Sequence, residues 1–323
     1  MRGLLIGVLA GLAVAMPVAA EPLTFVALGD MPYDPAQEET LQSAIAPAIR
    51  DRQPPFVVHL GDIKSGGLGC SDELLTRRRD EIYGLYDGPV FFTPGDNDWT
   101  DCDRSRIDGP KPELERLGYL RRLFFNEPPA VPSDWRHARQ AEFPENARWT
   151  TGGVTFATLH VVGTNNGRDE VLLDDVETAL DLVDARDEAN LRWLAAAFDA
   201  AADAGSAAVV IAMQADVTTA AIPTPCNAEV RVLCDGFAVL RDRLVRHAAA
   251  FRKPVLLVHG DTSPYCLDRA FGGRSARNLW RLNAPGDGLV IDAVEITVVP
   301  DDVKAPFAVK TLVGGHRLRR ECR

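Results

Sequence analysis

Beyond its first twenty residues, the sequence contains no stretch apolar enough to cross a bilayer, no internal repeat and no low-complexity tract. It also lacks a surplus of basic residues, because 35 Lys and Arg stand against 46 Asp and Glu, a formal net charge of −11 at pH 7. An acidic chain is a poor match for a nucleic-acid backbone or an anionic membrane surface. A small phosphorylated substrate is not excluded, since bound metal ions can invert the local field.

The chain also has no cysteine spacing of the kind that binds zinc, although it contains six cysteines. An even number fits three disulfides in an oxidising compartment, and fifteen pairings are formally possible. Two cysteines follow aspartates of the candidate site described below by eight and six residues, so we expect them to bridge those loops. Two others can close a short loop, which leaves the last two to pair. The predicted disulfides are Cys70–Cys102, Cys226–Cys234 and Cys266–Cys322.

The first twenty residues have the pattern of a signal peptide. Met1 and Arg2 precede an apolar run of about 13 residues, and Val18-Ala19-Ala20 resembles a cleavage site. We therefore expect residues 1–20 to be a signal peptide and residues 21–323 to form one exported, soluble domain, periplasmic or secreted. An uncleaved anchor is the alternative.

The most informative feature is a dipeptide that ends four separate apolar runs. These runs are FVALGD ending at Asp30, FVVHLGD at Asp62, VFFTPGD at Asp96 and VLLVHGD at Asp261. Short runs of this kind are typical of buried parallel strands, and side chains beyond their carboxyl ends converge on one edge of the sheet. Four carboxylates there would repel one another unless a cation lay between them, so the pattern predicts a metal or phosphate site. The alternative is that each Gly-Asp merely forms a turn.

Around these aspartates the sequence resembles the calcineurin-like metallophosphoesterase superfamily, whose pattern runs D-x-H, G-D-x-x-D, G-N-H-D/E, a lone His and G-H-x-H. Over roughly residues 23–300 the corresponding blocks are Asp30-Met-Pro-Tyr33, Gly61-Asp62-Ile-Lys-Ser65, Gly95-Asp96-Asn97-Asp98, Gln214 and Gly260-Asp261-Thr262-Ser263. The resemblance implies an α/β (α+β) fold. In that fold a four-layer sandwich of two mixed β-sheets is flanked by helices, with the metal site at the carboxyl ends of strands.

The resemblance also implies a set of metal ligands. The set is Asp30, Asp62, Asp96, the amide oxygen of Gln214, and Asp261. Asp62 corresponds to the aspartate that two metals share. Because all these donors are oxygens, we expect a hard divalent cation, Mn²⁺, Mg²⁺ or Ca²⁺, with one or two ions bound. This predicts a hydrolase, an exported metal-dependent phosphoesterase that cleaves a phosphate ester with a metal-activated water.

Several positions depart from the family pattern. Pro32 and Ser263 replace histidines, Ser65 replaces an aspartate, and Asn97 stands where the family has a histidine that assists catalysis. Two alternatives therefore remain open. One is a non-catalytic relative that binds a metal or a phosphorylated ligand, and the other is a structural, Ca²⁺-stabilised export protein.

Asn97 and His160 are the candidate catalytic residues. His160 lies in the apolar stretch 154–162 and could protonate a leaving group, although a histidine between Leu and Val is more often a core residue. Asp98 is expected to hold the GDND loop by accepting backbone N–H bonds.

The candidate substrate-binding residues are Tyr33, Lys64, Asn165 and Asn166. Lys64 could offer a charge to a phosphate or pair with the aspartates around it, and the two asparagines could donate hydrogen bonds to phosphate oxygens. Arg269, Arg274 and Arg277 could hold a phosphate or form a solvated basic face.

Periodicity and turn residues predict the order of elements. We expect strands at 23–29, 56–61, 90–94, 154–162, 207–213 and 255–259, and helices at about 36–52, 71–87, 112–125, 187–204 and 236–251. Residues 126–150 are predicted to be a surface excursion that covers the site. Alternating runs at 289–299 and 306–313 predict antiparallel strands of a second sheet.

Overall fold

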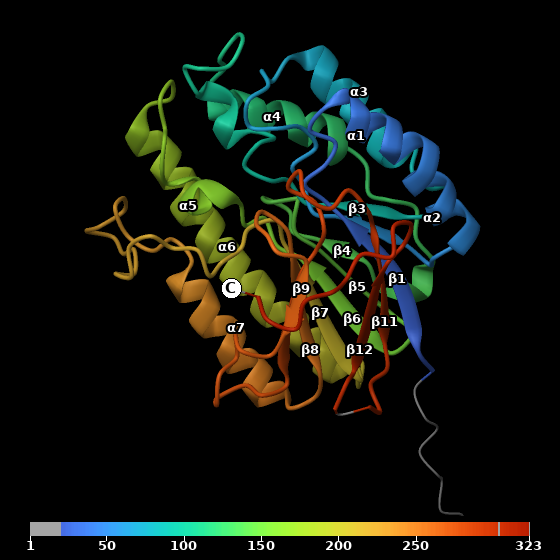
Figure 1. Cartoon of the computed structure of the whole chain (residues 1–323). Coiled ribbons are helices and arrows are strands. Elements are labelled where there is room, and N and C mark those ends of the chain that lie inside the picture. Colours follow the sequence, from blue (N-terminus) through green and yellow to red (C-terminus); the bar gives the residue numbers. More distant parts are fainter. Residues whose placement is uncertain (1–20, 303, 323) are drawn as a thin grey trace, which may run out of the picture.

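The computed structural model describes residues 21–302 and 304–322, so the predicted signal peptide lies outside the described residues. No helix within this described part combines the length and the apolarity that a bilayer crossing requires. Two β-sheets pack face to face, and helices cover the outer face of each, as Figure 1 shows. This is the predicted four-layer α/β architecture.

The first sheet has the order β12-β11-β1-β2-β3. Its strands are β1 (Leu23–Leu28), β2 (Val57–His59), β3 (Val90–Phe92), β11 (Val294–Val298) and β12 (Phe307–Thr311). β1, β2 and β3 are parallel, whereas β11 pairs antiparallel with β1 and with β12. The two C-terminal strands are antiparallel as predicted, but their assignment to a second sheet is wrong. β2 occupies only one side of β1, and β11 pairs with the other side.

The second sheet has the order β4-β5-β6-β7-β8-β10-β9. Its strands are β4 (Ala138–Arg139), β5 (Ala147–Thr151), β6 (Val154–Thr158), β7 (Ala208–Ala212), β8 (Val255–His259), β9 (Cys266–Asp268) and β10 (Leu279–Asn283). The prediction that residues 126–150 form only a surface excursion is therefore wrong. Gly152 and Gly153 adopt positive φ angles of 55° and 72°, which turns β5 back onto β6.

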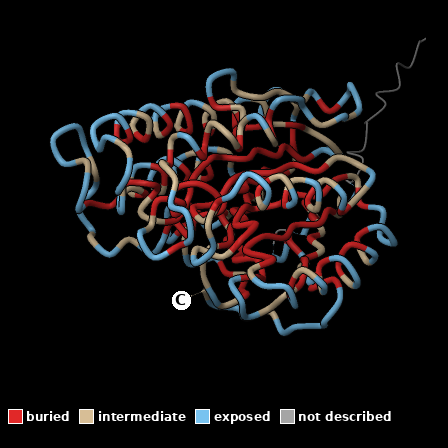
Figure 2. Tube along the Cα trace, turned by 90° about the horizontal axis from the view of Figure 1, so that it is seen from above, coloured by how far each residue is buried: buried red, intermediate tan, exposed pale blue. Residues whose placement is uncertain are grey.

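An aromatic cluster fills the space between the two sheets. Phe56, which directly precedes β2, is central to it, and its ring lies 4.8–5.8 Å, centroid to centroid, from five other aromatic rings. Those rings belong to Phe25, Phe91, Trp135, Trp149 and Phe156. Figure 2 shows the buried chain running through the centre of the molecule, with exposed segments around it. Because both sheets are covered on both faces, their parallel strands are continuous apolar runs.

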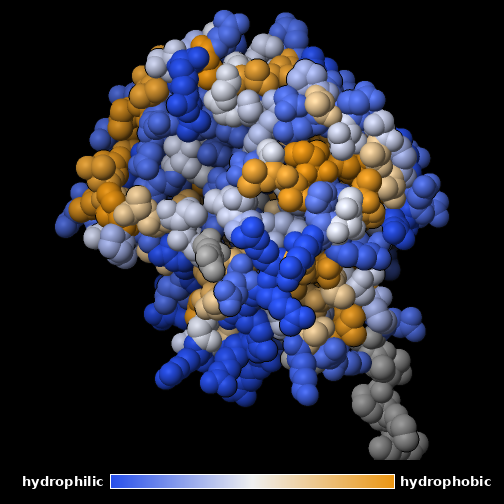
Figure 3. All heavy atoms as spheres, in the orientation of Figure 1, coloured by the Kyte–Doolittle hydropathy of each residue, from blue (hydrophilic) through white to orange (hydrophobic). Residues whose placement is uncertain are grey.

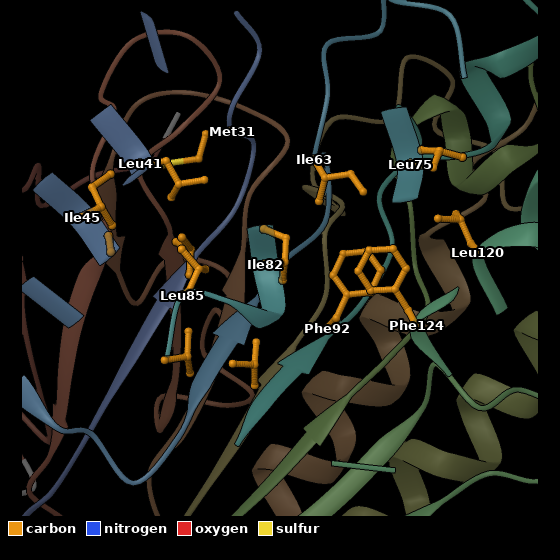
Figure 4. Packing of buried hydrophobic residues seen from close by; sticks show 14 of the residues in the cluster. Met31, Leu41, Ile45, Ile63, Leu75, Ile82, Leu85, Phe92, Leu120 and Phe124 are labelled. Atoms are coloured by element: carbon orange, nitrogen blue, oxygen red, sulfur yellow. The ribbon is translucent and has the colours of Figure 1, made fainter. Parts of the chain in front are cut away.

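The outer face of the first sheet is covered by three consecutive helical segments and two later helices. They are α1 (Pro35–Thr40), a π-helix (Leu41–Ile45), α2 (Ala46–Arg52), α3 (Asp72–Tyr83) and α4 (Glu113–Phe124). Figure 4 shows their apolar side chains packed together, with the ring of Phe124 stacked on that of Phe92 at 4.2 Å between centroids. Short 3₁₀ turns occur at Thr100–Asp103 and Ser133–Trp135.

The second sheet is covered by α6 (Val176–Asp203) and α7 (Ala238–Phe251), with a short left-handed turn, α5 (Gly163–Gly167), beyond the end of β6. α6 begins 11 residues before the predicted start at 187. Asp175 caps it by accepting the Thr178 backbone N–H, and the apolar stripe continues back through Val183 and Leu180.

All three predicted disulfides are confirmed. The structure contains Cys70–Cys102, Cys226–Cys234 and Cys266–Cys322. The first joins the loop after β2 to the 3₁₀ turn after β3, and the third ties the C-terminal segment to β9. Three disulfides fit an oxidising compartment.

Candidate functional site at the sheet edge

Four aspartates, one beyond each of β1, β2, β3 and β8, meet at one edge of the molecule. We call Asp30, Asp62, Asp96 and Asp261 the acidic cluster. Backbone N–H of Asp261 donates to Asp30 Oδ1 at 2.9 Å, and the Gln214 side chain contacts both Asp62 and Asp96. Three members are almost completely buried and Asp261 is partly buried. The convergence predicted from the strand ends is thus present.

In two of the four dipeptides the glycine makes room for the aspartate of another dipeptide. A Cβ atom on Gly95 would lie 2.0 Å from Asp62 Oδ1, and one on Gly260 would lie 1.8 Å from Asp30 Oδ2. Asp30, Asp62 and Asp261 themselves have positive φ angles of 53°, 55° and 72°. Left-handed backbone at three non-glycine residues of one edge is the kind of strain found at functional sites.

Asp62 accepts more side-chain hydrogen bonds than any other member of the acidic cluster. Its Oδ1 accepts the backbone N–H of Asn97 at 3.1 Å, and its Oδ2 accepts the Asn97 side-chain amide at 2.8 Å. The Tyr33 hydroxyl donates to the same Oδ2 at 3.2 Å. Two predicted site residues, Tyr33 and Asn97, therefore donate hydrogen bonds directly to the Asp62 carboxylate, for which the family resemblance implies the role of shared ligand.

Gln214 has the opposite orientation to the predicted one. Its amide oxygen, expected to bind metal, accepts the backbone N–H of Gly163 at 2.7 Å. Its NH₂ group donates to Asp96 Oδ1 at 2.9 Å and Asp62 Oδ2 at 3.3 Å. Gly163 begins the left-handed turn α5, and its backbone N–H points at the Gln214 side chain. The amide oxygen accepts this N–H and therefore faces Gly163.

Asp98 holds the loops of the cluster, as predicted. Its buried carboxylate accepts backbone N–H groups from Asp62 at 3.0 Å, Ile63 at 2.9 Å and Gly95 at 2.8 Å. Burial raises the pKa of Asp98 to about 6, although these hydrogen bonds and Lys64 lower it. One side chain thus fixes both the β2 loop and the β3 loop relative to each other.

Three of the four predicted substrate contacts are used inside the protein. Lys64 is fully buried and its ammonium donates to the carbonyl of Ser65. Burial lowers the pKa of Lys64, whereas the charges of Asp98 and Asp101 raise it. The Asn165 amide donates to Cys234 O, and that of Asn166 to Asp187.

Two further residues face the cluster, and one of them, Asp287, escaped the sequence analysis. The Thr164 hydroxyl donates to Asp96 Oδ2 at 2.8 Å, and the backbone N–H of Asp287 donates to the carbonyl of Asp30 at 3.2 Å. Asp287 belongs to a fifth Gly-Asp dipeptide, Gly286-Asp287, which no apolar run precedes. Repetition of the dipeptide was the signal that could have identified it.

His160 lies in the core, as its apolar neighbours indicate. The side chain has no exposed surface, its ring lies 5.5 Å from that of Trp99, and Glu145 Oε2 is 3.8 Å from Nδ1. Burial lowers the pKa of His160 well below its ordinary value, and the positive charge of Arg186 lowers it further. A neutral, enclosed imidazole fits the core alternative better than a general acid.

The cluster is electrostatically unfavourable by itself. Burial, assisted by repulsion from neighbouring aspartates, raises the pKa values of Asp30 and Asp62 well above the usual range. The same causes, with Asp96 as the main repelling charge, raise the pKa of Asp261 to about 8 and that of Asp101 to about 7. A bound cation would remove this repulsion.

These shifts predict a pH dependence. The folded chain keeps protons on Asp101 and Asp261 up to about pH 7 and 8, whereas the unfolded chain loses them near pH 4. Between about pH 4 and pH 8 the folded state therefore binds more protons than the unfolded state. As a result, the free energy of unfolding, measured in chelator, falls as pH rises from 5 to 8. Urea denaturation at both pH values measures the fall. In Asp261→Asn the fall in the free energy of unfolding should be smaller. An equal fall in that variant would show that Asp261 does not cause the pH dependence.

The residues fit a metal in donor type but are not already arranged as ligands. Within residues 21–302 and 304–322, no three His, Cys, Asp or Glu side chains are grouped so that they could hold a metal ion. Hydrogen bonds from neighbouring groups occupy both oxygens of Asp62 and of Asp96. The donors are nevertheless buried carboxylates, which hard divalent cations prefer.

The sequence matches no protein-family model and no curated protein. Its fold is similar to that in the solved structure described as "Structure of PhoD". The two are 12% identical and have a TM-score of 0.50, over 92% of this chain and 70% of that one. "GAP50 the anchor in the inner membrane complex of Plasmodium" is 12% identical with a TM-score of 0.48, covering 94% of this chain and 90% of that one. The likeness to PhoD is one of fold alone.

Proposed function

We propose that the chain is a metal-dependent phosphoesterase that hydrolyses a small phosphate ester. The observation that carries this proposal is the meeting of four aspartates from the carboxyl ends of β1, β2, β3 and β8 at one edge of a phosphoesterase-like fold. Ligands in open α/β sheets bind at that edge. Repulsion among buried carboxylates supports a cation as part of the functional state.

In this proposal Asp30, Asp62, Asp96 and Asp261 hold one or two hard divalent ions. When bound, such an ion polarises a phosphoryl oxygen and lowers the pKa of a coordinated water. Tyr33 and Asn97 fix the orientation of the Asp62 carboxylate through their hydrogen bonds. Thr164 does the same for Asp96, and Asp98 keeps the two loops in register.

The same proposal includes export. Three disulfides support an oxidising compartment, either periplasmic or extracellular, with residues 21–323 as one domain after removal of a signal peptide. Mass spectrometry of the N-terminus of the protein purified from its host would test the cleavage before Glu21.

One observation favours a second candidate, a non-catalytic relative that binds a phosphorylated ligand. The NH₂ group of Gln214 donates to both Asp62 and Asp96, so a neutral donor already satisfies one oxygen of each carboxylate that would hold a cation. Pro32, Asn97 and Ser263 stand where the superfamily that the sequence resembles has histidines.

Metal-restored hydrolysis separates the two candidates. The oxidised protein is treated with a chelator and then supplied with Mn²⁺, Mg²⁺ or Ca²⁺ beside chromogenic phosphomonoester and phosphodiester substrates. Turnover that returns with a metal supports the phosphoesterase. Absence of turnover with every ion, while the ions still raise the melting temperature, points to the binding protein.

A further inference from the structure

A groove of about 1100 Å³ lies beside the acidic cluster. One side is formed by Thr262 and Ser263, which follow Asp261, and by Gly286. A Cβ atom on Gly286 would lie 2.7 Å from the Asp30 Cβ, so this wall of the groove is also a wall of the cluster. A ligand in the groove would therefore adjoin the candidate site.

The opposite wall is the C-terminal segment, residues 316–321, which is fixed at several points. Asp292 accepts the backbone N–H groups of Val313 and Gly314 just before it. Arg319 pairs through its backbone with Tyr265 and Leu267, and the Cys266–Cys322 disulfide closes the end. A wall held in this way presents its side chains with little ordering cost on binding.

This wall is strongly basic in an acidic protein. Arg317, Arg319 and Arg320 are exposed and line the groove, and within the described part of the chain none of their guanidinium groups forms an ion pair. Glu321 is the one carboxylate among the lining residues. Figure 3 shows strongly hydrophilic side chains gathered across this face. Free guanidinium groups bind phosphate and carboxylate through paired hydrogen bonds.

The groove also has an apolar part. Pro285, Val290 and Leu289 contribute to its lining, and 70% of the Leu289 surface is exposed. An exposed leucine beside exposed arginines matches a ligand that has both an apolar body and an anionic group. By contrast, Arg269 and Arg277, weighed earlier as phosphate contacts, are not in the lining, and Arg269 donates to the carbonyl of Arg277.

We propose that this groove binds a second anionic group of the substrate. The inference rests on the proposed function, because the scissile phosphate is assigned to the acidic cluster. The substrate is then a phosphate ester that carries a further phosphate or carboxylate, joined to the scissile group through an apolar segment. Arg317 and Arg319 attract that group and offset the repulsion that the acidic cluster exerts on an anion.

The first test measures binding without metal or turnover. Isothermal titration calorimetry in chelator uses the full oxidised protein with hexyl phosphate, and hexanol serves as the uncharged comparison. We expect Arg317→Ala/Arg319→Ala to raise the Kd for hexyl phosphate about tenfold. Arg243→Ala/Arg246→Ala removes the same charge from exposed positions of α7 outside the groove and should leave the Kd unchanged.

The outcomes separate the groove from general electrostatics. Equal affinity of the wild type and the groove variant overturns the proposal, and so does an equal loss in both double variants. Arg317→Lys/Arg319→Lys keeps the charge but not the paired hydrogen bonds, so it should lose part of the affinity, and its melting temperature controls for misfolding. Equal losses in the Lys and Ala variants, with unchanged melting temperatures, would require guanidinium pairing and support the bidentate contact.

The second test uses turnover and distinguishes the two proposals. If a metal supports hydrolysis, hexane-1,6-diyl bisphosphate should have a kcat/KM about tenfold above that of hexyl phosphate, and the groove variant should lose this preference. If the arginines are needed for binding but no metal supports hydrolysis, the proposal of a phosphoesterase is wrong, while the groove remains a binding site for an anionic group. If the groove variant hydrolyses the bisphosphate with the same preference over hexyl phosphate as the wild type, only the proposal about the groove is wrong.

Discussion

Asp62→Asn is expected to lower kcat/KM for a phosphate ester on the order of 10³-fold in the metal-loaded protein. Asparagine has the same shape but carries no charge, so the cluster loses the carboxylate that lies between its other members. It also turns one oxygen into an NH₂ group that faces the existing donors Tyr33, Asn97 and Gln214. Steady-state kinetics with a chromogenic ester measures the loss.

The matched control for this variant is Asp87→Asn. Asp87 is exposed, lies between α3 and β3, and takes part in none of the described side-chain hydrogen bonds. It loses the same charge and should keep wild-type kinetics. If Asp62→Asn retains full activity while its circular dichroism spectrum and melting temperature match those of the control, the acidic cluster is not the site of chemistry.

Asp98→Ala is expected to lower the free energy of unfolding by at least about 3 kcal/mol, because three buried backbone N–H groups lose their acceptor at about 1–3 kcal/mol each. Those groups belong to Asp62, Ile63 and Gly95, so the loss falls on both loops of the cluster. Urea denaturation in chelator measures the change.

Two further variants make the Asp98 result specific. Asp98→Asn keeps one acceptor oxygen and should lie between the wild type and Asp98→Ala. Asp87→Ala removes an exposed carboxylate and should stay within about 0.5 kcal/mol of the wild type. A stability of Asp98→Ala equal to that of Asp87→Ala would mean that the backbone groups find other partners, and that Asp98 does not hold the loops.

The sequence was most informative where local pattern and function coincide. Continuous apolar runs that end in Gly-Asp identified four strands and the edge where they meet, because strand direction decides where the next side chain lies. The Cys70–Cys102 pairing followed from the same edge, because both cysteines come shortly after aspartates of the cluster. Asp98 was also predictable, since a short acidic side chain in a tight loop commonly accepts backbone N–H bonds.

Features that depend on contacts distant in sequence were missed. β11 lies beside β1 because of a pairing between residues more than 260 positions apart, and no local pattern encodes that choice of sheet. The orientation of Gln214 depends on the backbone N–H of Gly163, 51 residues away. Lys64 was a candidate contact for a phosphate, yet its side chain is fully buried, and its burial depends on how the loops around it pack.

The β4–β5 hairpin shows a different reason for a miss. Its strands are short and rich in Arg, Trp and Thr, and the polar residues made the segment resemble a loop. Trp149 provided a signal, because it points into the aromatic cluster while its neighbours Arg148 and Thr150 point away. A strand that buries only one of its faces needs only one buried residue in two.

The Cys70–Cys102 disulfide makes completion of the acidic edge a step of protein maturation. It joins the loop that carries Asp62 to the turn that follows Asp96. A covalent bond therefore fixes the distance between these two loops only after the cysteines are oxidised. A chain made in a reducing cytosol would assemble the same strands with these two loops held by hydrogen bonds alone. The yield of functional protein should therefore depend on the cellular compartment chosen for its production, even when total protein yield does not.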